Sequence, residues 1–369
     1  MVGETLTIKE ASNCLLQGLT PSSNHVADTK KIKMKTLICT TPHQFDYADT
    51  MPAVAGAGET LLKIKRIGIC GTDLHAFEGT QPFFNYPRIL GHELAAEIVT
   101  TGAPGFSNGE MVTFIPYFYC GQGIACRMGK PNCCTSIKVC GVHIDGGMRE
   151  YLTVPSYSLV HGQGLSVDEL ALVEPLAIGA HGVRRAAVTA GEFVLVIGAG
   201  PIGLGTMEFA KIAGGKVIAM DINDNRLDFC KEKLKVDFTI NPATEDAAEK
   251  LKTITHGDMP TVVIDATGNL KAINNAFQYL GHGGRYVLIG LQKGDINFNH
   301  PEFHKRESTL MSSRNATRDD FEHVISSMKK GWVNPATYIT HRVAFDAVKD
   351  NFESWLNPAT GVIKAMVEL

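Results

Sequence analysis

The chain has 369 residues, of which 44% are hydrophobic and 20% charged, with 35 Lys and Arg against 38 Asp and Glu. This composition is ordinary for a globular protein, and the length exceeds what one average core fills, so we expect two domains. A formal net charge of -3 excludes the strongly basic surface of a nucleic-acid-binding protein and gives no attraction to an anionic membrane. We therefore expect a small-molecule partner, with no nucleic acid and no membrane.

Residues 1–33 show neither the period of a strand nor that of a helix, and we interpret them as a disordered extension. Either Met34 is the natural start of the chain, or these residues form a flexible arm that touches a partner subunit. They lack the basic start, apolar stretch and cleavage site of a secretory signal, and no apolar run is long enough to cross a membrane. A cytoplasmic location is the expectation.

The cysteines are unevenly distributed. The chain has nine of them, and the segment from Cys120 to Cys140 is rich in cysteine. In a chain without an export signal, such crowding favours metal ligands or free thiols over disulfides.

Two regions with different patterns follow residue 33. Short strand-like runs separated by Gly and Pro extend from about Met34 to Val183 and indicate an all-β, barrel-like body. After GEFVLVIGAG, apolar strands alternate with helical segments, which is the pattern of a parallel, doubly wound sheet. From about Asn315 only a helix and a closing strand remain, so we expect this segment to return to the first domain. The predicted division is a catalytic domain over 34–178 and 315–369 and a nucleotide-binding domain over 179–314.

The string VLVIGAGPIGLG predicts a dinucleotide site. It places Gly198, Gly200 and Gly203 after an apolar strand and at the opening of a helix, where phosphates meet a helix N-terminus. The next strand ends in Asp221, whose carboxylate can accept both ribose hydroxyls and would repel a 2′-phosphate. Arg226 follows five residues later and would suit such a phosphate, but the carboxylate favours NAD over NADP.

Further cofactor contacts are expected around this turn and at the ends of later strands. DATG and LIGL end two of these strands, where nicotinamide and its ribose would lie. The additional expected contacts are Pro201, Ile202, Thr267, Ile289 and Lys364.

Three segments before the glycine turn contain metal-ligand types. GICGTDLH contains Cys70, LGHELA contains His92 and Glu93, and VEPLAIGAH contains Glu174. A thiolate, an imidazole and carboxylates suit a catalytic zinc that keeps one position open. Each residue alone also fits a structural role: a buried thiol, a histidine in a turn, or a carboxylate at a helix N-terminus.

Together with the glycine turn, these segments resemble the zinc-dependent medium-chain alcohol and polyol dehydrogenase family. The match includes GICGTDLH, YPRILGHE, VEPLAIGAHGVRRA and GAGPIG, in the family's order, and covers nearly the whole chain after Met34. The resemblance implies an α/β protein with a GroES-like β-barrel catalytic domain and a Rossmann doubly wound parallel-sheet domain. It also implies an active site between them and a homo-oligomer, either dimer or tetramer.

The resemblance also implies roles at the metal. Cys70 and His92 would bind a catalytic zinc, while Glu93 and Glu174 would share the remaining role, one of them through a water. This set of carboxylates is similar to that of the polyol and threonine dehydrogenase branch. The zinc would lower the pKa of the substrate alcohol, and hydride would pass to nicotinamide.

Three residues near Cys70 have implied supporting roles. Thr72 would pass the proton outward, and Asp73 would orient a ligand. His75 is either the outer end of this relay or an exposed histidine without a role.

Family members often carry a lobe with four cysteines around a second, structural zinc. In the segment CGQGIACRMGKPNCC, the residues that fit this pattern are Cys120, Cys126, Gly129, Asn132 and Cys134, but Gly123 occupies the second cysteine position. Structural zinc normally has four ligands, and glycine offers none. We therefore expect a lobe without metal, with Cys133 as the one obvious substitute ligand.

Two further segments resemble bacterial dehydrogenases of the L-gulonate and L-galactonate 5-dehydrogenase kind. The first offers His143 and Asp145, and the second offers Arg314 and Asn315 as substrate contacts. An arginine fork would suit a sugar-acid carboxylate, although Arg314 would equally serve to hold cofactor or join the domains. A neutral polyol, L-threonine or another secondary alcohol stays open as substrate.

Two other functions compete with this interpretation. A zinc-free quinone or enoyl reductase would keep the glycine turn but lack the Cys, His and Glu set. A non-catalytic protein that senses NAD(H) would not need metal ligands either. The presence of Cys70, His92 and Glu93 therefore favours an enzyme.

Overall fold

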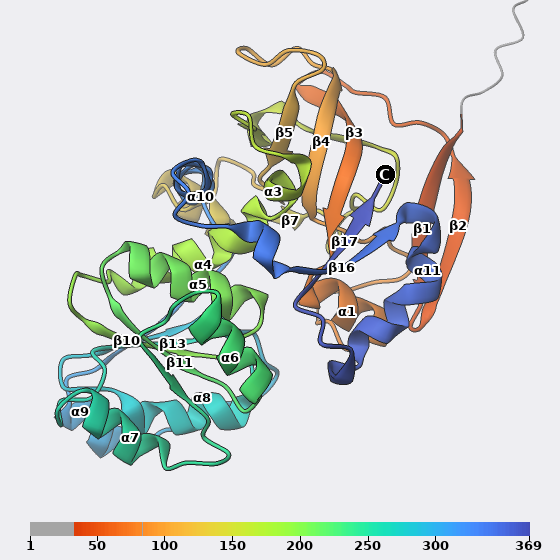
Figure 1. Ribbon diagram of the computed structural model, residues 1–369. Coiled ribbons are helices and arrows are strands. Elements are labelled where there is room, and N and C mark those ends of the chain that lie inside the picture. Colours follow the sequence, from red (N-terminus) through yellow and green to blue (C-terminus); the bar gives the residue numbers. More distant parts are fainter. Residues whose placement is uncertain (1–32, 83) are drawn as a thin grey trace, which may run out of the picture. The chain divides into compact units, whose positions relative to one another are not determined.

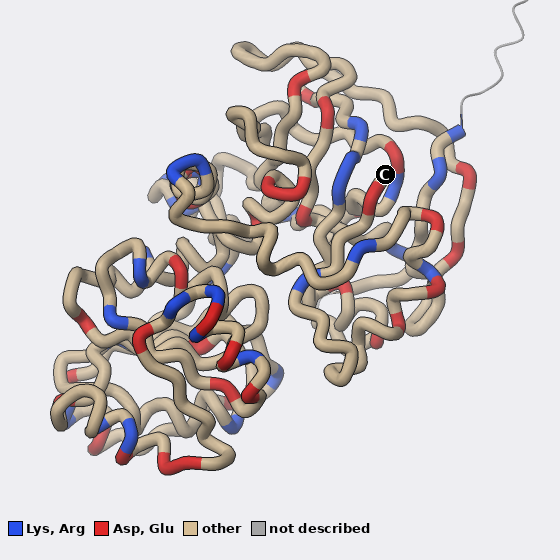
Figure 2. The backbone as a smooth tube through the Cα atoms, viewed as in Figure 1, with Lys and Arg blue, Asp and Glu red and all other residues tan. Residues whose placement is uncertain are grey.

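A computed structural model describes residues 33–82 and 84–369 (Figure 1). The extension expected over residues 1–33 therefore lies outside the described residues, except for Lys33. The first described strand, β1, begins at Met34. Figure 2 shows residues of both charge signs interspersed along the chain, in keeping with its near-neutral balance. No helix in the described part is long and apolar enough to cross a membrane.

A seven-stranded sheet forms the GroES-like part. Its strands run in the order β16-β17-β3-β4-β5-β9, with β8 paired to β3, and all pairs are antiparallel except β16 with β17. The bounds are β3 (Glu59–Gly68), β4 (Glu93–Thr100), β5 (Met111–Phe114), β8 (Tyr151–Pro155), β9 (Leu159–His161), β16 (Ile339–Ala344) and β17 (Lys364–Glu368). Because β17 pairs with β3, the C-terminal segment completes a sheet formed largely by residues before 162.

Smaller elements surround this sheet. Two separate antiparallel pairs are β1 (Met34–Thr41) with β2 (Gln44–Thr50) and β6 (Tyr117–Phe118) with β7 (Lys138–Val139). The helices are α1 (Gly71–Glu78), α2 (Ile124–Arg127), α3 (Val167–Ala171) and α11 (Val348–Asn351). Short 3-10 helices are η1 (Pro131–Cys133), η2 (Ser156–Ser158), η4 (Pro335–Tyr338), η5 (Phe345–Ala347), η6 (Phe352–Leu356) and η7 (Pro358–Thr360), whereas η3 (Phe277–Tyr279) belongs to the second, parallel-sheet part.

The second part is a six-stranded parallel sheet, as the alternation of strands and helices predicts. Its order is β12-β11-β10-β13-β14-β15, so the order reverses between β10 and β13. The bounds are β10 (Phe193–Ile197), β11 (Lys216–Met220), β12 (Phe238–Ile240), β13 (Val262–Asp265), β14 (Arg285–Leu288) and β15 (Thr309–Ser312). Such a reversal opens a crevice at the carboxyl ends of the strands, where dinucleotides bind in this fold.

Helices cover both faces of the parallel sheet (Figure 1). Along β10, Val194 and Val196 face one buried cluster and Leu195 and Ile197 face another, which is the period of two expected of a strand buried on both sides. The helices are α4 (Val173–Ala186), α5 (Pro201–Ile212), α6 (Asp224–Glu232), α7 (Ala247–Ile254), α8 (Leu270–Ala276), α9 (His300–Lys305) and α10 (Arg318–Lys329).

A close contact with α5 fixes the position of α4, whose first turn carries Glu174. A Cβ on Gly179 of α4 would lie 2.7 Å from the backbone N of Thr206 on α5, so only glycine lets the two helices approach this closely. Leu176 packs in the same cluster as Tyr117 and Ala95 of the GroES-like part. One continuous core therefore connects the two parts next to Glu174.

Candidate active site

Cys70, His92 and Glu93 come together because β3 and β4 are antiparallel neighbours. The register places Gly68, at the end of β3, opposite Glu93, at the start of β4. Cys70 follows β3 as the N-cap of α1, and His92 immediately precedes β4. A Cβ on Gly68 would lie 2.2 Å from Glu93 Oε2, so glycine leaves the space that this carboxylate fills.

The three side chains offer a set of ligands that fits zinc. One ligand atom each from Cys70, His92 and Glu93 lies within 4.8 Å of the others. His92 and Glu93 are buried, and the Nδ1 atom of His92 is buried without a hydrogen-bond partner in the described residues. Sulfur, nitrogen and carboxylate oxygen are the donors that zinc takes in proteins. The residues present therefore fit the metal.

The electrostatics also favour a cation here. Burial alone would lower the pKa of His92, but the nearby Asp73 and Cys70 raise it well above its ordinary value. The site thus favours positive charge although it is closed to water, as a divalent cation site does.

Asp73 ties the two metal-binding segments together. Its Oδ2 accepts from the backbone N of Cys70 at 3.0 Å, and its Oδ1 accepts from Gly91 N at 3.1 Å. His92 Nδ1 lies 3.8 Å from Oδ1. Burial raises the pKa of Asp73, whereas His92 lowers it. This placement is compatible with the orienting role that the family resemblance implies.

Lys364, which the sequence suggests as a cofactor contact, lies beside the candidate metal ligand Glu93. Its Nζ donates to Glu93 Oε1 at 2.7 Å, to Glu93 Oε2 at 2.6 Å and to the Ile69 carbonyl at 3.0 Å. The side chain is buried at the start of β17. Burial would lower the pKa of Lys364, but Glu93 and Cys70 raise it. The cofactor contact expected of Lys364 from the sequence stays a prediction.

Glu174 lies close by but outside the group of three. It is in the first turn of α4, and Tyr117 from β6 donates its hydroxyl to the Glu174 carboxylate. Burial raises the pKa of Glu174 to about 7, against the opposing effect of His92. The structure therefore offers Glu93 as the carboxylate nearest to Cys70 and His92, with Glu174 held by a tyrosine.

The two proton-relay candidates lie on one face of α1, one turn apart. Thr72 is half-buried and His75 is exposed. His75 Nδ1 lies 3.3 Å from both Glu78 Oε2 and Thr80 Oγ1.

The glycine turn has the conformation that its sequence predicts. Gly198 has φ of +97°, and a Cβ on Gly203 would lie 1.8 Å from the Gly198 carbonyl oxygen. Gly200, the N-cap of α5, has no atom within 4 Å of the place of a Cβ. Pro201 and Ile202 form the first turn of α5, whose N-terminal backbone N–H groups make a phosphate site.

The acidic residue after β11 lies against this turn. Asp221 Oδ2 accepts from Ala199 N at 2.7 Å, and Oδ1 accepts from Asn223 N at 2.9 Å. Arg226 is engaged with backbone carbonyls, Ala199 O at 3.1 Å and Val362 O at 2.6 Å.

The softer cofactor candidates lie at the carboxyl ends of neighbouring strands. Thr267 follows β13, where its Oγ1 donates to Asp265 Oδ2 at 2.8 Å, and its methyl group lies against Gly198. Ile289 follows β14 and packs on Gly182 of α4. Both therefore border the point where the strand order reverses.

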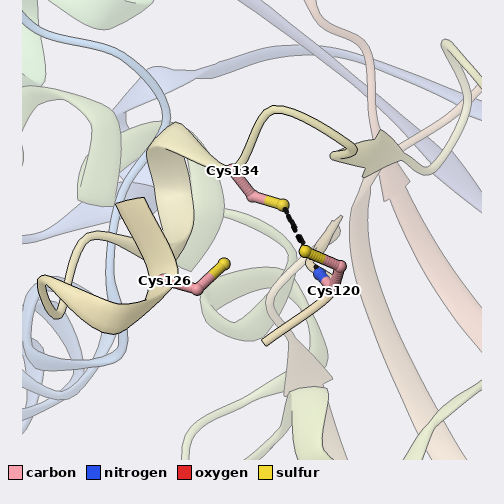
Figure 3. A group of neighbouring side chains, drawn as sticks. All are labelled: Cys120, Cys126 and Cys134. Carbon is pink, nitrogen blue, oxygen red and sulfur yellow. Dashed lines mark hydrogen bonds between the residues drawn. The ribbon is translucent and has the colours of Figure 1, made fainter. Parts of the chain in front are cut away.

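The cysteine lobe differs from the expectation of a lobe without metal. Figure 3 shows Cys120, Cys126 and Cys134 pointing toward one another, with their sulfurs within 4.8 Å. The Sγ atoms of Cys134 and Cys120 are 3.4 Å apart. Backbone hydrogen bonds from Gln122 and Gly123 lower the pKa of Cys120 to about 7. Three gathered thiols weigh against the expected empty lobe, whereas the exposed Cys133 is outside the group.

The expected substrate residues are placed on the segment after β15. Arg314 is exposed, and Asn315 has a left-handed φ of +54°. Burial lowers the pKa of His143, and the positive charges of Arg314 and Arg88 add to this effect. Asp145 Oδ1 lies 3.3 Å from an Arg88 nitrogen.

Sequence reasoning missed several residues of this site. Tyr117 lies in a two-residue strand that carries no motif, and the role of Lys364 depends on its pairing across the sheet. Asn132 and His181 lie in segments with a family motif, but the motif does not predict the contact between their side chains.

A six-stranded parallel sheet with a glycine turn, joined to a GroES-like part that gathers thiolate, imidazole and carboxylate, defines a zinc-binding dehydrogenase that acts on CH–OH groups. Comparison with protein-family models matches residues 56–163 to the alcohol dehydrogenase GroES-like domain and residues 201–330 to the zinc-binding dehydrogenase domain. The chain belongs to the zinc-binding medium-chain dehydrogenase family.

Individual relatives agree. The chain is 44% identical over 322 residues to L-galactonate-5-dehydrogenase of Escherichia coli, covering 87% of this chain and 94% of that protein. It is 32% identical to sorbitol dehydrogenase of Halalkalibacterium halodurans, over 84% and 92% of the two chains. Among solved structures, an E. coli alcohol dehydrogenase (rspB) complexed with NADH superposes with a TM-score of 0.84 and 30% identity, covering 91% of this chain and 99% of that one.

Proposed function

We propose that this chain is a zinc-dependent, NAD-linked dehydrogenase that oxidises one CH–OH group of a sugar acid of the L-gulonate or L-galactonate type. The observation that carries the proposal is the convergence of Cys70, His92 and Glu93 within 4.8 Å. Neither a zinc-free reductase nor a non-catalytic sensor needs this set of ligands.

Cys70, His92 and Glu93 would hold the catalytic zinc, with Glu174 near it. When bound, zinc supplies a Lewis acid that eases loss of the alcohol proton. Lys364 positions Glu93 by donating to both of its oxygens. With its pKa raised to about 7, Glu174 can exchange a proton near neutral pH.

Thr72 and His75 would carry the alcohol proton away from the buried site. Thr72 is half-buried and His75, one turn further along α1, is exposed, so the two side chains span the distance from the interior to solvent. His75 is suited to the outer position because its exposed imidazole has one nitrogen that can donate and one that can accept a proton.

NAD is the proposed hydride acceptor. The carboxylate of Asp221 lies beside the turn of Gly198 and Gly200, where it suits a ribose diol and opposes a 2′-phosphate. Arg226 donates to two backbone carbonyls, so its fork is occupied within the protein.

A sugar acid is the proposed substrate because the segment that leaves β15 carries Arg314, an exposed basic side chain suited to a carboxylate. Arginine pairs with carboxylates through two parallel N–H donors. The 44% identity to an L-galactonate-5-dehydrogenase supports the same class.

A second zinc is proposed in the cysteine lobe. Cys120, Cys126 and Cys134 would supply three thiolates, and Gly123 leaves the fourth corner free, since a Cβ there would lie 3.8 Å from Cys120 Sγ. Metal analysis should then return more than one zinc per chain.

A homo-oligomer is also proposed. β15 is an edge strand of the parallel sheet, and Leu310 on it is 37% exposed. An exposed strand edge is a surface on which a second copy can pair. Light scattering of the purified protein would measure the mass.

The decisive experiment combines metal analysis with a substrate screen. The purified protein would be assayed with NAD and NADP on L-galactonate, L-gulonate, galactitol, sorbitol and L-threonine. We expect turnover of an aldonate with NAD, and near-complete loss of turnover in Cys70→Ser and His92→Ala with the fold retained. Full activity of Cys70→Ser after chelation would overturn the zinc mechanism, and preference for L-threonine would overturn the sugar-acid assignment.

A further inference from the structure

A pair of reciprocal hydrogen bonds joins the cysteine lobe to the segment that carries Arg314. Asn132 Nδ2 donates to the Arg314 carbonyl at 2.9 Å, and Asn315 Nδ2 donates to the Asn132 carbonyl at 3.1 Å. Asn132 is in η1, between Cys126 and Cys134 of the lobe. Each asparagine side chain thus holds the backbone of the other segment, although more than 180 residues separate them.

The Asn132 amide is itself fixed by a buried chain of hydrogen bonds. Its Nδ2 also lies 3.3 Å from His181 Nε2, and His181 Nδ1 lies 2.8 Å from Asp320 Oδ2. These contacts fit one neutral tautomer of His181, with the proton on Nδ1 donated to the carboxylate and Nε2 accepting from the amide. Both hydrogens of the Asn132 amide then have an acceptor.

The same chain fixes the segment on its far side. Asp320 Oδ2 accepts from Thr317 N at 2.8 Å and from Arg184 at 2.8 Å. Thr317 is the N-cap of α10. Residues 314–317 are therefore held at one end by the lobe and at the other by Asp320, with Arg314 projecting from the fixed stretch as an exposed side chain.

Asn315 adopts a left-handed backbone conformation. Its φ of +54° lies in the left-handed region, which costs a side chain other than glycine some free energy. Glycine would adopt this conformation more readily, so the backbone shape alone does not require asparagine. The amide that glycine lacks is the group that binds Asn132.

We propose that Asn132 and Asn315 are positioning residues that hold Arg314 where it meets the carboxylate of the substrate, so that the cysteine lobe helps to set specificity for acids. This inference rests on the proposed function. It assigns to the lobe a role in substrate recognition, through the peptide that it holds, in addition to any metal that it binds.

Asn315→Gly is the informative variant, because it keeps the left-handed backbone and removes only the amide. We expect the KM for L-galactonate to rise about five- to tenfold, the size of one lost hydrogen bond, with kcat and the Kd for NADH within about twofold. Galactitol, which carries CH₂OH in place of the carboxylate, should be little affected. Glu307→Gly is the matched control, since Glu307 is also left-handed, at φ +49°, but exposed near α9.

Asn132→Ser tests the other half of the pair. It should raise the KM for L-galactonate similarly, and the double variant Asn132→Ser/Asn315→Gly should lose less than the product of the two single effects, because the bonds join the same two segments. An unchanged KM for L-galactonate in Asn315→Gly, or a parallel rise in the Kd for NADH, would overturn the proposal.

Arg314→Ala separates this inference from the proposed function. Suppose that Arg314→Ala raises the KM for L-galactonate but not for galactitol, while Asn315→Gly changes neither KM. The positioning role is then wrong and the carboxylate contact stands. If Arg314→Ala weakens both substrates alike and raises the Kd for NADH, the carboxylate contact is wrong and the positioning role falls with it.

Discussion

Lys364 and Glu93 form a buried ion pair whose members are both almost fully excluded from solvent. Taking two charges out of water is costly, and replacing such a pair by apolar side chains often stabilises a protein. The pair is therefore better explained by the metal than by stability. It fixes both carboxylate oxygens of Glu93 beside Cys70 and His92.

Lys364→Met should therefore destabilise the zinc-free protein strongly, because it leaves Glu93 buried and unpaired. We expect a loss of about 3 kcal/mol or more in the free energy of unfolding without zinc. The loss should be smaller with zinc bound, since the ion supplies the missing positive charge. Urea unfolding with and without zinc measures both values.

Lys35→Met is the control for this comparison. It breaks the exposed pair with Asp346, at 2.7 Å, and should change the free energy of unfolding little whether zinc is present or not. An equal loss in Lys364→Met with and without zinc would show that Glu93 does not face the metal.

Asp221 is expected to decide between the two nicotinamide cofactors. Asp221→Ser should weaken the binding of NAD. The difference in binding free energy between NAD and NADP should narrow by about 1 to 3 kcal/mol, as for one lost charged hydrogen bond. Steady-state kinetics with both cofactors measure the gap. Asp228→Ser, which removes the same charge from an exposed position on α6, should leave it unchanged. Equal use of NAD and NADP by the unmodified protein would contradict this role.

At the scale of elements, the turn between β10 and α5 contains glycines that are needed for two different reasons. Gly203 is needed by the protein itself, since a Cβ there would lie 1.8 Å from a backbone oxygen. At Gly200 no atom of the described residues beyond its chain neighbours lies within 4 Å of the place of a Cβ, and φ is −77°, which any residue adopts. A reason to keep glycine at this second position has to come from a ligand.

Gly203→Ala should consequently lower the melting temperature and abolish NAD binding together. Gly200→Ala should keep the melting temperature within about 2 °C while weakening NAD by about tenfold or more, because the added methyl group would block close approach of the pyrophosphate. Thermal unfolding and fluorescence titration with NADH test this pair. A Gly200→Ala variant that binds NADH normally would argue against a pyrophosphate at this turn.

Across the whole molecule, the features that could be predicted are those encoded in short stretches of sequence. The glycine turn, the parallel sheet and the segments of Cys70 and His92 follow from runs of a few residues and from the family resemblance. The position of Lys364 could not be predicted, because its partner Glu93 is 271 residues away and the two meet only through the pairing of β17 with β3. The expectation for the cysteine lobe failed for a related reason. Counting ligands in the motif does not reveal that the folded loop gathers the remaining three sulfurs.

A salt-bridge network ties distant parts of the GroES-like sheet together. Asp168 at the start of α3 receives Arg66 Nε of β3 at 2.9 Å and Arg342 of β16 at 2.6 Å. Burial would raise the pKa of Asp168, but hydrogen bonds from Arg342 and Arg66 lower it overall. The Asp168 side chain is 25% exposed, so solvent only partly screens the network.

The sign of the pH dependence follows from this lowered pKa. In the unfolded chain the carboxyl titrates near 3.8, and in the folded chain below that value. The network therefore contributes its full stability above the unfolded pKa and loses it as pH falls through the folded pKa.

Asp168→Asn should reduce the free energy of unfolding by about 1 to 2 kcal/mol at pH 7, and this deficit should shrink below about pH 4. Asp319→Asn removes the same charge from an 80% exposed side chain paired to Arg184, and should change stability little at either pH. Denaturant unfolding of the three proteins between pH 3 and pH 7 measures the difference, and a deficit in Asp168→Asn that is as large at pH 3 as at pH 7 would show that the paired carboxylate is not its source.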